Sequence, residues 1–103
     1  MSEHPPKPRV SIEYCPRCGW LLRSAWLAQE LLTTFSADLA EVALVPSAES
    51  GRFLVLVGDT IVWSRQTDGG CPGAAELKRR VRDRVAPGRA LGHSDTTDAE
   101  SKG

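Results

Sequence analysis

The sequence predicts an α/β fold, more closely an α+β sandwich, with the element order β-α-β-β-β-α and a four-stranded mixed sheet beside two helices. Three patterns carry this prediction: a period-2 alternation at residues 9–14, a helical apolar stripe from 17 to about 36, and two strand-like runs flanking Gly58-Asp59. A chain of 103 residues, 41% of them hydrophobic, suffices for one core of this kind and not for two.

The first strand and the first helix meet at a cysteine. Arg9 to Tyr14 alternates between apolar and polar side chains, as a half-buried strand does. Pro16 suits the first position of a helix, where its missing N–H is not needed, and this makes Cys15 the expected N-cap. The expected helix, residues 17 to about 36, carries a broad apolar face of Leu21, Ala25, Ala28, Leu32 and Phe35, widened by Leu22, Trp26 and Leu31.

The rest of the sheet follows in two short steps. Residues 39–45 are apolar and partly β-branched, and the long crossover before them favours a strand parallel to the first. Their alanines and leucines leave an extension of the helix as the alternative. Residues 52–57 and 60–65 predict a hairpin whose Gly58-Asp59 turn suits type II′ geometry. After a polar loop at 66–70, a second helix is expected over 74–86, with its apolar face formed by Ala74, Leu77, Val81 and Val85.

Composition bounds the domain and its partners. We expect a flexible lead at residues 1–8, one domain at 9–86 and a disordered tail at 87–103. The formal net charge is zero and no apolar run is long enough to span a bilayer, so neither nucleic acid nor a membrane is an expected partner. The expected location is cytoplasmic. The basic side chains of the second helix, from Lys78 to Arg84, are interpreted as a solvated face.

The C-x-x-C pair Cys15/Cys18 is the main candidate site. An odd count of three cysteines disfavours a secreted disulfide framework, and in a reducing compartment such a pair is typically redox-active or metal-binding. A helix N-terminus and the cation of Arg17 would both favour a thiolate, so we expect Cys15 to be the nucleophile and Cys18 the resolving thiol. A zinc half-site and two merely structural cysteines are the alternatives, but a second ligand pair for zinc is missing and His4 and His93 fall in the expected tails.

Several longer motifs resemble those of the selenoprotein W-like proteins, the Rdx group within the SelT/SelW/SelH family. The similarity rests on VSIEYCPRCGW at 10–20, GRFLVLVGDTIVWSR at 51–65, and DGGCP at 68–72 leading into AELKRRVRD at 75–83. The resemblance implies a thioredoxin-like fold and a thiol oxidoreductase without a bound cofactor or metal. It also implies a partner that is a protein thiol or disulfide, or glutathione. By position, Cys18 matches the residue that is selenocysteine in some members.

Two positions depart from the family pattern. Cys71 stands where an aromatic residue is usual in bacterial relatives, so it is either an extra thiol or a small replacement in the packing. No proline precedes the third strand as the cis-proline of thioredoxin does, Pro46 and Pro72 being the nearest, which puts thioredoxin-like substrate docking in question.

The neighbours of the cysteines are expected to tune their pKa values or to shape the surface around them. These residues are Tyr14, Pro16, Arg17, Gly19 and Trp20. Trp26 and Trp63 are interpreted as core or as anchors of a homodimer interface. The rival to an oxidoreductase is a non-catalytic binding module in which the C-x-x-C pair serves as a redox switch.

Overall fold

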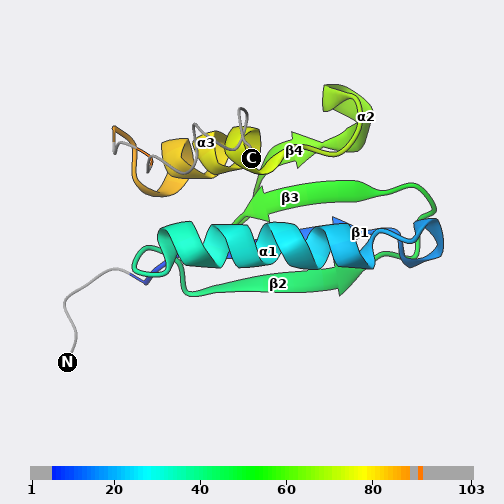
Figure 1. Ribbon diagram of the computed structural model, residues 1–103, viewed down its shortest axis with the longest axis horizontal. Helices are drawn as coiled ribbons and strands as arrows, with labels where there is room; N and C mark the ends of the chain where they lie inside the picture. Colours follow the sequence, from blue (N-terminus) through cyan, green and yellow to red (C-terminus); the bar gives the residue numbers. More distant parts are fainter. Residues whose placement is uncertain (1–5, 89–90, 92–103) are drawn as a thin grey trace.

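A four-stranded mixed sheet carries its two main helices on one face (Figure 1). The computed structural model describes residues 6–88 and 91. In chain order the elements are β1 (Arg9–Tyr14), the 3₁₀ turn η1 (Pro16–Cys18), α1 (Leu21–Phe35), β2 (Glu41–Pro46), β3 (Phe53–Val57), β4 (Thr60–Ser64), α2 (Arg65–Asp68) and α3 (Ala74–Val85). The predicted fold class is confirmed, and the arrangement is consistent with a thioredoxin-like one.

The strands lie in the order β2-β1-β3-β4. β1 pairs parallel with β2, and α1 forms the crossover between them, as the long connection predicted. β1 and β3 are antiparallel, as are β3 and β4. Consequently β1, β2 and β4 all run in one direction. Their carboxyl ends therefore lie at the same edge of the sheet, together with the amino end of β3.

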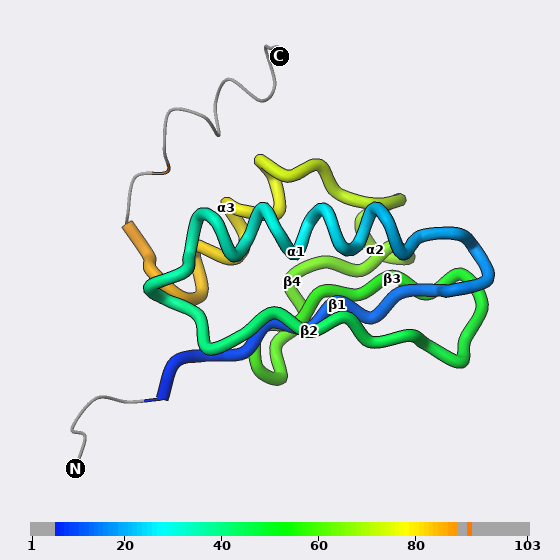
Figure 2. Tube along the Cα trace, turned by 60° about the horizontal axis from the view of Figure 1, so that its bottom comes forward, coloured from blue at the N-terminus to red at the C-terminus, as the bar shows by residue number. Residues whose placement is uncertain are grey.

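The core lies between one face of the sheet and the helices (Figure 2). Alternate residues of β1 and β3 point into it, and their neighbours on the opposite face are only half-buried. The buried strand residues are Val10, Ile12, Tyr14, Phe53, Val55, Val57, Val62 and Trp63. A register shift at Val55/Leu56 places both Val62 and Trp63 of β4 in the interior.

The first helix differs from the prediction in where it begins and in which face it buries. Gly19 adopts φ 75°, a left-handed conformation that ends the short turn η1, so α1 begins only at Leu21. The face against the sheet is Ser24, Leu27, Ala28, Leu31 and Phe35. The predicted face was therefore wrong by part of a turn, and Leu22 and Trp26 stay 84% and 44% exposed.

The second half of the chain departs from the prediction at one loop. Residues 65–68 form the short helix α2 where a polar loop was expected, because the Asp68 carboxylate accepts a hydrogen bond from the Ser64 N–H at 2.9 Å. In the hairpin, Gly58 adopts φ 59° while no described non-glycine residue has a positive φ, as the predicted type II′ turn requires.

The two ends of the chain fall largely outside the described residues, and with them most of the predicted lead and tail. The Pro8 carbonyl accepts a hydrogen bond from the Ala40 N–H at 2.8 Å, and Leu91 packs against the core.

In α3, one expectation fails: Lys78 is 3% exposed and its ammonium lies 2.9 Å from Glu30 of α1. This basic residue joins the two helices and does not belong to a solvated face.

Candidate dithiol site

The cysteine pair lies in the turn between β1 and α1. Cys15 directly follows β1 in an extended conformation and precedes η1, and the Cys18 N–H approaches the Cys15 carbonyl oxygen at 3.3 Å. Both thiols are free. The Cys15 side chain is buried, with 1% of the residue exposed, whereas Cys18 is exposed. The turn thus presents one sulfur to solvent and holds the other beneath it.

The Cys15 sulfur is the more acidic of the two. A hydrogen bond from the Cys18 thiol is the largest cause, and together with backbone N–H groups of Gly51, Cys18 and Arg17 it outweighs burial and lowers the pKa of Cys15 to about 7. The same hydrogen bond raises the pKa of Cys18 above its usual value, because Cys18 is the donor. A Gly51 N–H and the positive charge of Arg65 act in the opposite direction on Cys18.

These environments change the expected division of labour between the sulfurs. Cys15 does favour the thiolate, as predicted, but its burial keeps it from an incoming disulfide. Cys18 is the sulfur that such a molecule can reach. Which sulfur attacks first stays a prediction, because acidity favours Cys15 and exposure favours Cys18.

The structure does not place the dipole of the long helix or the positive charge of Arg17 where the sequence analysis expected them to act on Cys15. Cys15 caps the three-residue turn η1, while the residue that caps α1 is Trp20, so the dipole of the long helix does not begin at the cysteine. Arg17 lowers the pKa of Cys15 through its backbone N–H. The cation that acts on the pair is Arg65, which lowers the pKa of Cys18 and which the sequence reasoning missed.

Trp20 connects the cysteine turn to α2. Its ring meets Phe53 edge-on, with centroids 6.3 Å apart and planes at 84°, and the Arg65 guanidinium lies 5.2 Å from a Trp20 ring centroid. Trp20 is half-buried against the core. Trp20 therefore packs against the core and also contacts Arg65 of α2, while a role in shaping the surface that a partner meets stays a prediction.

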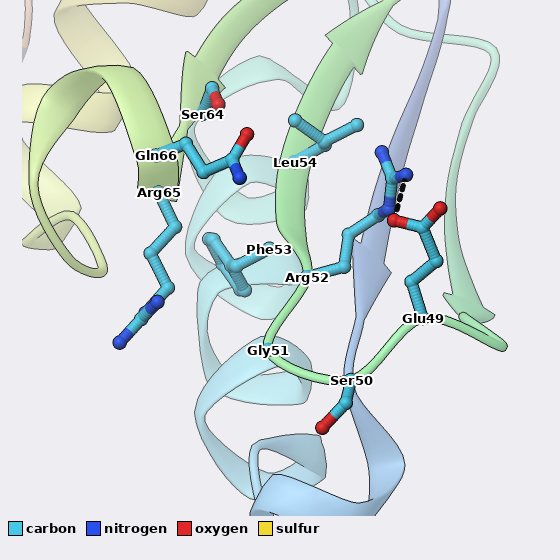
Figure 3. Close-up of a pocket in the computed structure, with 9 residues that line it drawn as sticks. All are labelled: Glu49, Ser50, Gly51, Arg52, Phe53, Leu54, Ser64, Arg65 and Gln66. Carbon is cyan, nitrogen blue, oxygen red and sulfur yellow. Dashed lines mark hydrogen bonds and ion pairs between the residues drawn. The ribbon is translucent and has the colours of Figure 1, made fainter.

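A cavity of ≈ 170 Å³ opens between the β2–β3 loop and the start of α2 (Figure 3). The loop contributes Gly51, whose N–H lowers the pKa of both thiols, and α2 contributes Arg65. The cavity thus shares two residues with the dithiol environment. Its remaining lining residues are Glu49, Ser50, Arg52, Phe53, Leu54, Ser64 and Gln66.

The other predicted site residues have mainly structural surroundings. Tyr14 is buried in the core, Pro16 begins η1 and Gly19 ends it. Cys71 is half-buried and packs against the core, in keeping with a small replacement in the packing. Pro46 ends β2, Pro72 is buried before α3, and no peptide bond of the described residues is cis.

No group of three or more histidine, cysteine or carboxylate side chains suited to a metal ion occurs in residues 6–88 and 91. His4 and His93, the histidines considered for a zinc site, lie outside those residues. Over the same part of the chain, no helix is long and apolar enough to cross a membrane.

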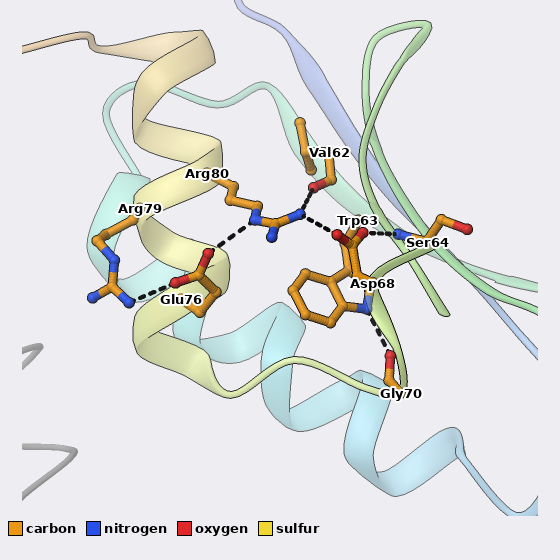
Figure 4. A network of polar contacts seen from close by, with 8 residues as sticks. All are labelled: Val62, Trp63, Ser64, Asp68, Gly70, Glu76, Arg79 and Arg80. Atoms are coloured by element: carbon orange, nitrogen blue, oxygen red, sulfur yellow. Dashed lines mark hydrogen bonds and ion pairs between the residues drawn. The ribbon is translucent and has the colours of Figure 1, made fainter. Parts of the chain in front are cut away.

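A second arginine lies over a second tryptophan, at the junction of β4, α2 and α3 (Figure 4). The Arg80 guanidinium lies 4.5 Å from the Trp63 ring centroid and donates hydrogen bonds to Glu76, Asp68 and the Val62 carbonyl. The Trp63 indole N–H donates to the Gly70 carbonyl at 2.8 Å. The Ser64 N–H and then Arg80 lower the pKa of Asp68, whereas Arg79 and then Arg80 lower the pKa of Glu76. Glu76 and Asp68 in turn raise the pKa of Arg80, so this cation is bound within the fold.

Fold and site together define an α+β protein with a C-x-x-C dithiol at the junction between its first strand and first long helix. The model of the Rdx family matches residues 9–83, and the chain belongs to this family.

Two solved structures support the same assignment. A crystal structure of a Bordetella parapertussis protein is 54% identical with a TM-score of 0.74, covering 77% of this chain and 99% of that one. A selenoprotein W-related protein from Vibrio cholerae is 49% identical with a TM-score of 0.73, covering 76% of this chain and 96% of that one. A search of curated proteins gave no match. The predicted resemblance is confirmed, and the family is one associated with redox function.

Proposed function

We propose that this protein is a thiol-disulfide oxidoreductase that uses the Cys15/Cys18 dithiol and no resident metal or nucleotide. One observation carries the proposal: an exposed Cys18 thiol is hydrogen-bonded to a Cys15 sulfur whose pKa is about 7. Such a pair is about half ionised near neutral pH, far more than an ordinary thiol, and offers one sulfur to solvent. Its expected substrates are a protein disulfide or glutathione disulfide.

Exchange on this pair proceeds in two steps. Cys18 passes its proton along the hydrogen bond to the Cys15 thiolate, then attacks one sulfur of the substrate disulfide and releases the other half as a thiolate. Solvent protonates that leaving group. Cys15 next loses its proton and attacks the Cys18 sulfur, which breaks the mixed disulfide and releases the second thiol. The dithiol has then lost two electrons, the substrate has gained them, and a reducing thiol must restore the pair.

Trapping of the mixed disulfide tests this order of attack. In a Cys71→Ser background, Cys15→Ser removes the resolving sulfur, so a model disulfide should accumulate as an adduct on Cys18 that intact-mass spectrometry detects. Cys18→Ser should leave only the buried sulfur and slow adduct formation at least about tenfold, since access and thiolate fraction together control the rate. Adducts on Cys15 with none on Cys18 would reverse the two roles. Adducts in neither variant would refute the proposed function.

The binding-module alternative has one observation in its favour. Leu22 and Trp26 leave an exposed apolar strip on α1 at the end nearest the cysteine turn. Turnover separates the two functions, because a module would form at most one disulfide per chain and would not reduce successive substrate molecules when a reducing thiol is supplied. A homodimer remains a prediction.

A further inference from the structure

Arg65 is a cation whose charge is not balanced by a carboxylate of the described fold. It is exposed, and among residues 6–88 and 91 no ion pair or side-chain hydrogen bond engages its guanidinium. Its described contact is the face of Trp20, at 5.2 Å from the ring centroid. Stacking restricts the guanidinium to one side of the indole and leaves its N–H donors available.

The second arginine of the cavity provides an internal comparison. Arg52 bonds to the Glu49 carboxylate and lies 3.8 Å from a Glu13 oxygen. Figure 3 shows this ion pair on one wall of the cavity and Arg65 extending without a polar partner from the opposite side. Of the two cavity arginines, Arg65 is therefore the one that can accept an anion without first breaking an ion pair.

Arg65 lies at the edge of the sheet that carries the cysteine turn, so an anion bound by Arg65 would be close to the reacting sulfur. Arg65 begins α2 directly after β4, at the same edge of the sheet as the cysteine turn after β1. The Trp20 ring that it covers is two residues beyond Cys18. A molecule whose sulfur meets Cys18 would therefore have its neighbouring atoms beside Arg65.

Resting on the proposed function, we propose that Arg65 is a specificity-determining residue that selects disulfides carrying a carboxylate close to the reacting sulfur. The guanidinium would bind that carboxylate through charge-assisted hydrogen bonds, while the adjoining cavity accepts the remaining atoms of the disulfide substrate. The carboxylate can belong to a small disulfide acid or to an acidic side chain next to a cysteine in a polypeptide. Both sources offer Arg65 the same chemistry.

A charge series of small disulfides measures this selectivity. Dithiodipropionate, hydroxyethyl disulfide and cystamine have similar two-carbon arms that end in a carboxylate, a hydroxyl and an ammonium group. Each rate constant with the reduced full chain, in a Cys71→Ser background, is divided by the rate constant of the same reagent with a small free thiol, which removes the difference between the leaving groups. These normalised rate constants should fall in that order. For an exposed to half-buried ion pair we expect the anionic reagent to react about three- to tenfold faster than the neutral one.

Variants at Arg65 show whether this residue is the cause. Arg65→Gln should bring the anionic-to-neutral rate ratio close to one, and Arg65→Lys should retain a preference of the same sign. Arg23→Gln is the matched control, because it removes an equal charge from an exposed position on α1 and should leave the ratio unchanged. The ratio cancels any general change in thiol reactivity, since the same Cys18 sulfur attacks all three reagents.

A peptide arm identifies the source of the carboxylate. A disulfide-linked peptide with aspartate beside its cysteine is compared with its asparagine twin in wild type and Arg65→Gln. An Arg65-dependent preference in either arm supports the proposal, and the larger preference shows which substrates the site favours. Neutral disulfide reduction with no Arg65-dependent preference in both arms would overturn the proposal and leave the oxidoreductase standing. Failure of every disulfide to react would overturn both.

Discussion

Two arginine-tryptophan pairs in this small protein have the same chemistry and opposite surroundings. Arg80 lies over Trp63, and its guanidinium is hydrogen-bonded to two carboxylates and a carbonyl (Figure 4). Arg65 lies over Trp20, beside the dithiol, and no carboxylate of the described residues pairs with it. The N–H donors of Arg80 are used within the fold, whereas those of Arg65 stay available for the proposed ligand.

The difference shows how a structural cation can be told from a functional one. Stacking on an aromatic ring is common to both, so it does not discriminate. What discriminates is the count of hydrogen-bond acceptors that the fold brings to the guanidinium. The Val62 carbonyl reaches Arg80 at a strand irregularity, and Asp68 reaches it from the end of α2. Among residues 6–88 and 91, no comparable acceptor reaches Arg65.

Shortening each tryptophan gives the largest expected contrast. Trp63→Phe removes a buried indole and its 2.8 Å hydrogen bond to Gly70, so the free energy of unfolding should fall by about 2 kcal/mol. Trp20→Phe removes a half-buried ring edge and an exposed cation contact, and should cost less than about 1 kcal/mol. Urea denaturation of the two variants measures both values. Equal losses would contradict the division into a structural and a functional pair.

Neutralising each arginine should give a smaller contrast of the same sign. Arg80→Gln leaves the Val62 carbonyl and the Asp68 carboxylate without their donor, and the melting temperature should fall by about 5 to 10 °C. Arg65→Gln should change it by less than about 2 °C, because an exposed side chain with one ring contact is lost. Thermal unfolding at one protein concentration compares them, with Arg23→Gln as a surface control.

The thiol titration should show the smallest effect. In a Cys71→Ser background, thiolate absorbance should rise through pH about 7 as Cys15 ionises, and the exchange rate should fall as the pH drops below that value. Arg65→Gln should raise the pKa of Cys18, since a nearby positive charge is lost, whereas Arg80→Gln should leave the pKa values of both thiols unchanged.

Cys18→Ala should raise the pKa of Cys15, and Cys18→Ser should raise it less because a hydroxyl can still donate a hydrogen bond. If the pKa of Cys15 did not change in Cys18→Ala, the hydrogen bond from Cys18 would not be the cause of its lowered value.

The sheet could be predicted from the sequence because its signals are local. Alternation gave β1 its bounds at Arg9–Tyr14, and Gly58 identified the hairpin of β3 and β4. The helix α1 was harder. An apolar arc as wide as the one from Leu21 to Phe35 fits several rotations about the helix axis, and packing against the sheet selected the stripe that contains Ser24 and Leu27.

The site could be predicted only as far as the cysteines. The C-x-x-C motif and the strand before it located the dithiol, but exposure of Cys18 and burial of Cys15 depend on how the turn sits against the sheet. Arg65 and Gly51 were missed because they are distant in sequence. Strand directions held the missing signal, since the carboxyl ends of β1 and β4 and the amino end of β3 share one edge. The prediction that Lys78 belongs to a solvated basic face failed for a similar reason, because its partner Glu30 lies on the other helix.

Gly19, in its left-handed conformation, separates the cysteine turn from α1. On one side lie three residues of η1, held by backbone hydrogen bonds of 3.3 and 3.2 Å, and on the other lies the helix that anchors the core through Leu27, Leu31 and Phe35. When the two sulfurs form or break a bond, the turn can change shape without unwinding a helical turn that the core depends on. In the proposed thiol-disulfide exchange, a change in the cysteine turn would therefore leave the core contacts of α1 in place.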